Sequence, residues 1–256
     1  MAKLVVMIRL KDSITFIHEW LACYEKLADE IVALDNGSTD GCVEILQAHP
    51  KVVEIIQTVG YNEGRDKKLL YAGMRSRNPD WCLWVDVDEI MEPGVTRKDL
   101  DRLMTNQFIN RYAFRRFHFS DTVHFAASAY WRNYSAGHDR VLWREQPAGY
   151  FEDKVLDSPN VKGITGIKIP TNIRLKHLGY INKELVDRKA AVYRSVITPD
   201  KVENINTMYL HNEKKMAWRD NRHHPQVILF NGWLNLLLLR QYAVKAFDRV
   251  RNRSNQ

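Results

Sequence analysis

Short apolar runs and helical periodicity alternate along the first part of the chain. The runs with the length and composition of buried strands are residues 4–8, 30–34, 52–58 and 81–85. Apolar residues recur at helical spacing in the segments between them, residues 14–27, 43–46 and 64–77. Strands and helices that alternate in this way predict right-handed crossovers and a mostly parallel sheet.

After Pro93 the pattern changes to an alternation of polar and aromatic residues. Residues 111–119 show it most clearly, and this alternation is typical of a strand. Further strands are expected at 140–144 and 173–180, and helices at 98–104 and 183–195. The prediction is an α/β fold with a mixed, mostly parallel sheet flanked by helices, whose later strands are antiparallel or mixed.

The end of the chain has a different composition. Residues 226–239 form an apolar helical pattern that Asn231 and Asn235 interrupt, which disfavours a span across a bilayer. The basic residues that follow are Arg240, Lys245, Arg249, Arg251 and Arg253. This C-terminal helical extension has three open placements: in a membrane interface with its arginines on anionic headgroups, on the rest of the chain, or on a second copy.

Three carboxylates follow the apolar run 81–85 directly: Asp86, Asp88 and Glu89. Isolated buried charge is very costly, so we expect all three at the exit of the strand, facing solvent or a bound cation. An Asp-x-Asp at the carboxyl end of a parallel strand suits Mg²⁺ or Mn²⁺ bound to a diphosphate. A solvated acidic turn is the alternative.

A second polar loop, Asp35-Asn36-Gly37-Ser38, follows the strand expected at 30–34. In a parallel sheet this loop and the acidic cluster lie at the same edge. Its side chains could accept a hydrogen bond from a base and shape a nucleoside pocket. The alternative is an ordinary capped turn between a strand and a helix.

Composition limits the classes of protein. The chain has 256 residues, 45% of them hydrophobic, which suits one large α/β domain with a substantial core. The net charge of +7 favours an anionic partner: a nucleotide, a nucleic acid or an acidic membrane surface. Cys23, Cys42 and Cys82 are scattered, and the apolar part of the N-terminus is too short for a signal peptide. We therefore expect a reducing, cytoplasmic location.

Four segments together resemble glycosyltransferase family 2, whose members have the nucleotide-sugar-binding GT-A fold. Residues 35–40 are similar to the family's nucleotide loop, and residues 63–67 resemble the segment that closes over the nucleotide. Residues 86–89 are similar to its metal-binding DxD motif. Residues 174–180 resemble the late strand that supplies a metal-binding His in many GT-A enzymes. The order and spacing of these segments are more specific than any one of them.

The resemblance implies a metal-dependent, inverting transferase that uses a nucleotide-diphospho-sugar in polysaccharide or glycan biosynthesis. The residues implied for the nucleotide and its phosphates are Asp35, Asn36, Ser38, Arg65 and Asp86, with Lys68 as a further phosphate contact. The residues implied for Mn²⁺ or Mg²⁺ are Asp86, Asp88 and His177.

The catalytic base is expected in residues 149–154, which resemble the family's acceptor-site segment. Asp153 is the first candidate for accepting the proton of the acceptor hydroxyl, and Glu152 is the second. No Gln-x-x-Arg-Trp motif is present, which favours single-sugar transfer over processive synthesis. Trp131 and Tyr134 are the aromatic residues that best suit an acceptor site.

By this resemblance, residues 1–200 form the catalytic domain, with a nucleotide-sugar half (1–92) and an acceptor half (93–200), and residues 201–256 form the extension. The expected partners are a donor, UDP-sugar above all, and a glycan or lipid-linked acceptor, but no nucleic acid. Peripheral contact with the cytoplasmic membrane face and an oligomer are the further options.

Two other functions stay open. A sugar-nucleotide pyrophosphorylase would need a Gly-rich loop after the first strand, where residues 9–12 have none. A basic nucleic-acid binder would rest on the net charge and on Arg115 and Arg116, and it leaves the carboxylate cluster unexplained.

Overall fold

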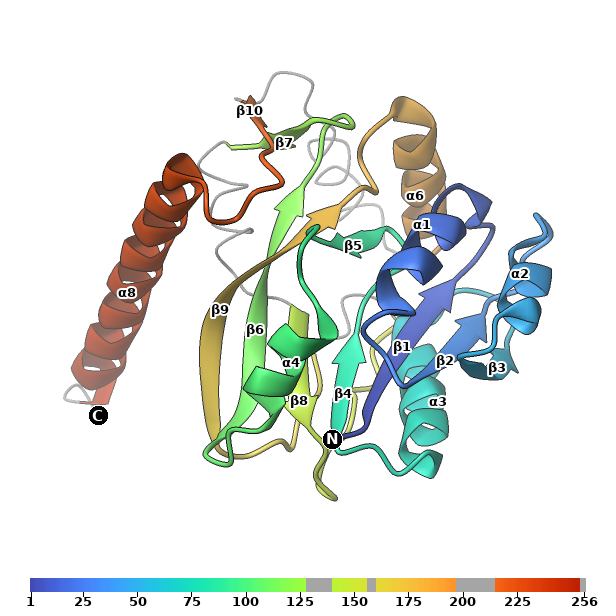
Figure 1. The fold of residues 1–256 in the computed structure, drawn as a ribbon, viewed down its shortest axis with the longest axis horizontal. Helices are drawn as coiled ribbons and strands as arrows, with labels where there is room; N and C mark the ends of the chain where they lie inside the picture. The colour runs from blue at the N-terminus through green and yellow to red at the C-terminus, as the bar shows by residue number, and fades with distance from the viewer. Residues whose placement is uncertain (128–139, 156–159, 197–214, 254–256) are drawn as a thin grey trace.

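An eight-stranded mixed sheet forms the centre of the computed structural model, with helices on both faces (Figure 1). The structure describes residues 1–127, 140–155, 160–196 and 215–253. Its helices are α1 (Ile14–Tyr24), α2 (Cys42–Ala48), α3 (Glu63–Ser76), α4 (Arg97–Met104), α6 (Lys183–Val196) and α8 (Pro225–Arg253). Its strands are β1 (Leu4–Leu10), β2 (Glu30–Asp35), β3 (Val52–Gln57), β4 (Trp81–Trp84), β5 (Glu89–Met91), β6 (Ile109–His118), β7 (His124–Ala126), β8 (Arg140–Arg144), β9 (Ile167–His177) and β10 (Lys215–Ala217).

The sheet has the order β3-β2-β1-β4-β8-β6-β9-β5. The four strands of the first half are all parallel to their neighbours. In the second half, β8 is antiparallel to both β4 and β6, β6 and β9 are parallel, and β9 and β5 are antiparallel. The predicted fold class is therefore confirmed as an α/β fold, with a sheet that is parallel in its first half and mixed in its second.

The strand β1 shows why continuous apolar runs predicted this half correctly. Leu4, Val6 and Ile8 belong to the core that α1, α2 and α4 cover, whereas Val5 and Met7 belong to the core that α3 covers. Successive side chains of a strand point to opposite faces, so a strand with helices on both faces must be apolar at every position.

The shorter and more polar strands were predicted less well. The strand expected at 173–180 begins earlier, at Ile167, and ends at His177. Its first residues are largely exposed and include Pro170, so they lack the pattern of a buried strand. The three-residue strands β5, β7 and β10 were not predicted at all.

The helix α8 lies on the side of the molecule opposite α2 and β3 (Figure 1). Near its beginning, β10 pairs with β7 in a separate two-stranded sheet. Within the described ranges, no helix combines the length and apolarity needed to cross a membrane. The division of the chain at residue 200 stays a prediction, because residues 197–214 lie outside the described part.

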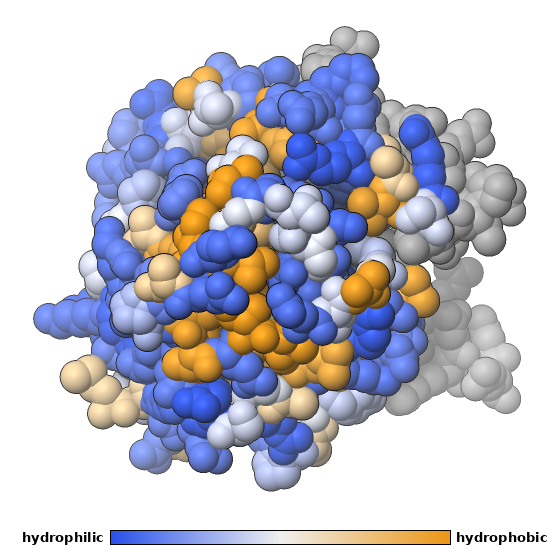
Figure 2. Space-filling model, turned by 90° about the vertical axis from the view of Figure 1, so that its right-hand side faces the viewer, coloured by the Kyte–Doolittle hydropathy of each residue, from blue (hydrophilic) through white to orange (hydrophobic). Residues whose placement is uncertain are grey.

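The side that carries α2 and the edge strand β3 is hydrophilic over most of its surface, but a band of apolar side chains crosses it (Figure 2). Exposed apolar residues of the segments at this edge include Val53 and Val59, which are 37% and 86% exposed. The sheet therefore ends here at a strand that only partly buries its apolar side chains.

Candidate functional site

The candidate site lies at the edge of the sheet where the parallel strands end. β1 lies between β2 and β4 and runs parallel to both. Asp35 is the last residue of β2, and Asp86 comes two residues after the end of β4. The carboxyl ends of parallel strands share an edge, so the two predicted loops lie on either side of β1 at one edge of the sheet.

The Asp35 carboxylate shapes its own loop. It is 2% exposed, and its oxygens accept hydrogen bonds from the backbone N–H groups of Gly37 and Ser38 at 3.1 and 3.0 Å. Gly37 has a φ of +86°, a conformation that favours glycine. The Ser38 hydroxyl accepts from the backbone N–H of Asp12 at 2.8 Å, which joins this loop to the end of β1. The loop is thus a well-ordered capped turn, and its contact with a nucleoside stays a prediction.

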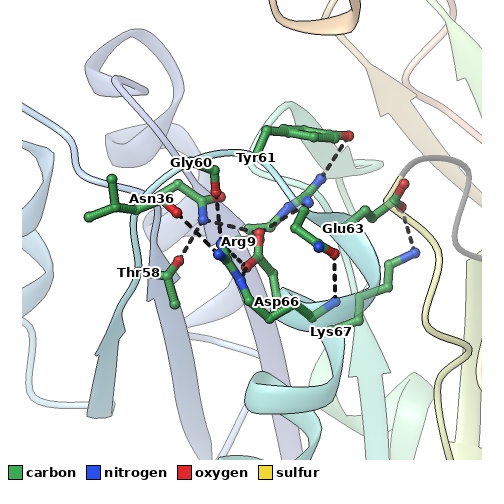
Figure 3. Close-up of polar contacts among 11 residues, drawn as sticks. Arg9, Asn36, Thr58, Gly60, Tyr61, Glu63, Asp66 and Lys67 are labelled. Atoms are coloured by element: carbon green, nitrogen blue, oxygen red, sulfur yellow. Dashed lines mark hydrogen bonds and ion pairs between the residues drawn. The ribbon is translucent and has the colours of Figure 1, made fainter. Parts of the chain in front are cut away.

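Asn36 (Figure 3) and Arg65 both use their polar groups for hydrogen bonds within the protein, although the Arg65 side chain is 38% exposed. The Asn36 amide donates to Thr58 Oγ1 at 2.7 Å and to Asp66 Oδ2 at 3.0 Å. The Arg65 guanidinium donates to Asp66 Oδ1 at 2.7 Å and to the carbonyl of Gly60 at 2.7 Å. Asp66 is fully buried, and these hydrogen bonds link the Asp35–Ser38 loop to the beginning of α3. A contact of Asn36 or Arg65 with a ligand stays a prediction.

Arg9, near the end of β1, completes this cluster. Its guanidinium lies 3.5 Å from Asp66 Oδ2, donates to the Tyr61 hydroxyl at 3.3 Å and lies over the Tyr61 ring (Figure 3). Burial alone would lower the pKa of Arg9, but Tyr61, Glu63 and Asp86 raise the pKa by more. Arg9 therefore stays positively charged, and its charge interacts favourably with that of Asp86. Sequence reasoning missed it, although a charged residue inside an apolar strand is a usable signal.

The prediction that all three carboxylates of the acidic cluster face solvent or a cation is wrong for Glu89. Glu89 is fully buried in β5, and its carboxylate accepts from the backbone N–H of Asp86 at 3.0 Å. Its charge is compensated by the Arg116 guanidinium at 3.2 Å. Buried charge is tolerated when it is paired, and the partner comes from β6, distant in sequence.

Asp88 and His177 meet as the resemblance implied. β5 pairs with β9 with Glu89 opposite His177, and the backbone N–H of Leu178 donates to the Asp88 carbonyl at 2.8 Å. His177 Nε2 lies 3.3 Å from Asp88 Oδ2. A Cβ atom at Gly179 would lie 2.2 Å from the same oxygen, so a glycine at this turn leaves room for the carboxylate.

The His177 ring suits a divalent cation. Burial, the largest influence, lowers its pKa, which favours the neutral imidazole that metals bind. Its Nδ1 lies 2.9 Å from Nδ1 of the buried His118, which fixes the ring so that Nε2 points to Asp88. One imidazole nitrogen and one carboxylate oxygen fit Mn²⁺ or Mg²⁺ as a partial set of ligands. The described ranges contain no group of three or more His, Cys, Asp or Glu residues close enough for a metal. Phosphate oxygens and water would complete the set.

The helix α6 contributes two residues that sequence reasoning missed. Lys189 Nζ lies 3.7 Å from Asp88 Oδ2 and above the Tyr180 ring. Burial lowers the pKa of Lys189, but Tyr180 and Asp88 raise it further, so the side chain is cationic. Tyr193 contacts Tyr61 edge to face, with ring centroids 6.3 Å apart. α6 therefore contacts the edge of the sheet that carries the Asp86–Asp88 segment. The sequence of α6 has the pattern of an ordinary amphipathic helix, which does not indicate that Lys189 and Tyr193 reach this edge of the sheet.

The two candidates for the base lie in a loop that is bound to the beginning of α3. The backbone N–H of Gly64 donates to the Lys154 carbonyl at 2.7 Å. The Asp153 side chain is 64% exposed and pairs with Lys68 at 2.6 Å. Glu152 pairs instead with Lys154 at 3.2 Å. Asp153 is thus accessible from solvent. Lys68 forms an ion pair with this carboxylate, so it is not simply a solvated side chain. Trp131 and Tyr134 lie outside the described residues.

Comparison with known proteins identifies one family. The model of Glycosyl transferase family 2 matches residues 9–165, more than half of the chain. A search of curated proteins found no match. Among solved structures, S. aureus TarS residues 1–349, alone and in complex with UDP, are similar to this chain at 14% identity and a TM-score of 0.47, covering 81% of this chain and 70% of that one. The mannosyltransferase PcManGT from Pyrobaculum calidifontis in complex with GDP-Man and Mn²⁺ is similar at 11% identity and a TM-score of 0.46, covering 81% and 69%.

Proposed function

Because the chain belongs to glycosyl transferase family 2 and is therefore a glycosyltransferase, we propose that it transfers one sugar from a nucleotide-diphospho-sugar to an acceptor hydroxyl, with inversion and with Mn²⁺ or Mg²⁺ as cofactor. The observation that carries this proposal is the contact of Asp88 with His177 at the sheet edge that also carries the Asp35 loop. Family membership favours this reaction over a pyrophosphorylase or a nucleic-acid binder.

On the donor side, Asp88 and His177 bind the cation, and Asp86 contacts the ribose or metal-bound water. The cation would neutralise charge on the diphosphate as it leaves the sugar. Asp35, Asn36 and Ser38 form the nucleoside loop, whose contribution is rigidity, because its polar groups are held by the loop itself and by Asp66. Lys189 adds a positive charge next to Asp88 that suits a phosphate. A UDP-sugar is the first donor to test.

On the acceptor side, Asp153 accepts the proton of the attacking hydroxyl. Inversion requires this carboxylate on the side of the anomeric carbon opposite the diphosphate. The exposure of Asp153 allows an acceptor hydroxyl to reach it, and the Gly64–Lys154 hydrogen bond fixes its loop to α3. Glu152 is the second candidate.

The test of the metal site is Asp88→Asn, with Asp187→Asn as the matched control. Asp187 is 59% exposed on α6 and pairs with Lys183, so the control makes the same chemical change outside the site. Asp88→Asn is expected to lower transfer and donor hydrolysis by about a hundredfold or more, since it removes a direct metal ligand. It should also abolish the rise in melting temperature that Mn²⁺ gives in the presence of donor. Full activity of Asp88→Asn with Mn²⁺ would disprove the role of Asp88.

The donor and the stereochemistry need separate measurements. A thermal-shift screen of nucleoside diphosphates and their sugars identifies the donor, because a ligand that binds the folded state raises the melting temperature. NMR of the first product then gives its anomeric configuration. Retention of configuration would contradict the inverting mechanism and the role of Asp153 as a base.

A further inference from the structure

Only one face of the beginning of α8 packs on the rest of the protein. Val227, Asn231 and Leu234 are 7%, 4% and 0% exposed. Phe230 lies beside them and contacts Phe117 of β6 and Phe125 of β7, with ring centroids 6.3 and 5.9 Å apart. These residues follow one another at helical spacing and define the inner face of α8.

The outer face of α8 is apolar and exposed. Leu229, Leu236 and Leu239 are 72%, 66% and 64% exposed, Ile228 is 55% exposed and Trp233 is 36% exposed. Leu229, Trp233, Leu236 and Leu239 follow one another at spacings of four, three and three residues, with Ile228 next to Leu229, so all five lie on one broad stripe of the helix. A contiguous stripe of large apolar side chains on a surface marks a site of interaction.

The inner face carries polar groups that are poorly satisfied. Asn231 Oδ1 is buried and has no hydrogen-bond partner among the described residues. Asn235 accepts a hydrogen bond from Arg115, a fully buried residue whose Nε and Nη1 also lack partners in the described ranges. The helix therefore turns asparagines inward and leucines outward, which is the reverse of the arrangement that water favours.

Charge indicates what covers the outer face. From Arg240 to Arg253 the sequence contains five basic residues and one acidic residue, and the Arg240 side chain is exposed. A helix with an apolar stripe followed by basic residues suits an anionic lipid surface, in which the apolar side chains enter the headgroup boundary. A second copy of the chain carries the same basic residues, so a parallel pairing of the two helices would bring like charges together.

We propose that the outer face of α8, defined by Ile228, Leu229, Trp233, Leu236 and Leu239, binds the interface of a membrane that contains anionic lipid. The surface is independent of the transferase site, and its test does not require activity. The purified full-length protein should sediment with vesicles of phosphatidylcholine and phosphatidylglycerol. It should sediment less with phosphatidylcholine alone, and high salt should weaken the binding.

The decisive variant is Leu229→Glu with Leu236→Glu. Loss of each leucine from the lipid interface is expected to lower vesicle binding by about tenfold or more. The matched control is Gln226→Glu, which adds negative charge at an exposed position of the same helix outside the apolar stripe and should weaken binding much less than the double variant does. All the substituted side chains are exposed, so the melting temperature should stay within a few degrees and establish that the variants fold.

Three results would overturn the proposal. The first is vesicle binding that the double variant does not weaken, and the second is no binding of the unchanged protein to anionic vesicles. The third is a dimer in light scattering that Leu236→Glu converts to monomers while vesicles bind neither form, which would assign the face to a second copy of the chain.

Discussion

Two buried charged residues, Asp66 of α3 and Arg115 of β6, have opposite surroundings. In the first half, the fully buried Asp66 accepts hydrogen bonds from Asn36 and Arg65 and lies beside Arg9. In the second half, the fully buried Arg115 donates to Asn235 and to no other partner in the described ranges. The first cluster fixes the loops of the candidate site in one geometry. The second is an interface that does not fully satisfy its polar groups, which fits a helix whose second surface serves another partner.

The largest expected effect is that of Asp66→Ala. The substitution leaves the buried Arg9 and the nearby Arg65 without their shared carboxylate, and the free energy of unfolding should fall by about 3–5 kcal/mol. Chemical denaturation measures this change. The control Asp187→Ala removes an exposed ion pair and should change the free energy of unfolding by less than about 1 kcal/mol. Equal effects of the two variants would mean that the cluster does not stabilise the first half.

The second prediction concerns Arg115→Met and has the opposite sign. Burial lowers the pKa of Arg115 to about 10, and no carboxylate compensates it among the described residues. An apolar side chain of similar length should therefore raise the free energy of unfolding, by about 1–3 kcal/mol. A loss of stability would show that this guanidinium is satisfied in solution and would remove the contrast between Arg115 and Asp66.

The smallest expected effect is that of Asp40→Asn, and it depends on pH. Asp40 accepts from the backbone N–H of Ile14 at 2.7 Å, the first residue of α1, and from that of Cys42 at 3.2 Å. Burial would raise the pKa of Asp40, but these hydrogen bonds outweigh it and lower the pKa below its usual value of 3.8. Because the pKa of Asp40 is lower in the folded state, its charged carboxylate stabilises the fold at pH values above the unfolded-state pKa. This stabilisation is lost as the pH falls through the folded-state pKa. Asp40→Asn should thus cost about 1 kcal/mol at neutral pH. The difference should disappear in denaturation curves measured well below pH 3.8.

The sequence predicted the first half well because its physical constraints are local. Strands with helices on both faces are apolar runs, and the loops at their carboxyl ends are polar, so Asp35 and Asp86 could be assigned to one edge. His177 and Asp88 were also brought together as implied, by the pairing of β5 with β9.

The missed features depend on partners that are distant in the sequence. Glu89 is buried because Arg116 of β6 neutralises it, and nothing near Glu89 in the sequence indicates this. Lys189 reaches Asp88 across about a hundred residues, and its helix has no unusual pattern. A local pattern reports on burial, but it does not report which distant charge makes burial of a carboxylate possible.

The contact between α3 and the loop at residues 152–155 has a consequence for how phosphate is bound. A helix N-terminus is a ready anion site only while its first N–H groups are unoccupied. In α3 the N–H groups of Glu63 and Gly64 donate to the carbonyls of Val155 and Lys154, and that of Arg65 donates to Asn62 Oδ1. The positive end of this helix dipole is thus satisfied internally. If the proposed donor binds at this edge, side-chain cations and a metal ion would have to balance the charge of its diphosphate. Donor binding should then be more sensitive to chelators and to ionic strength than binding at a free helix N-terminus would be.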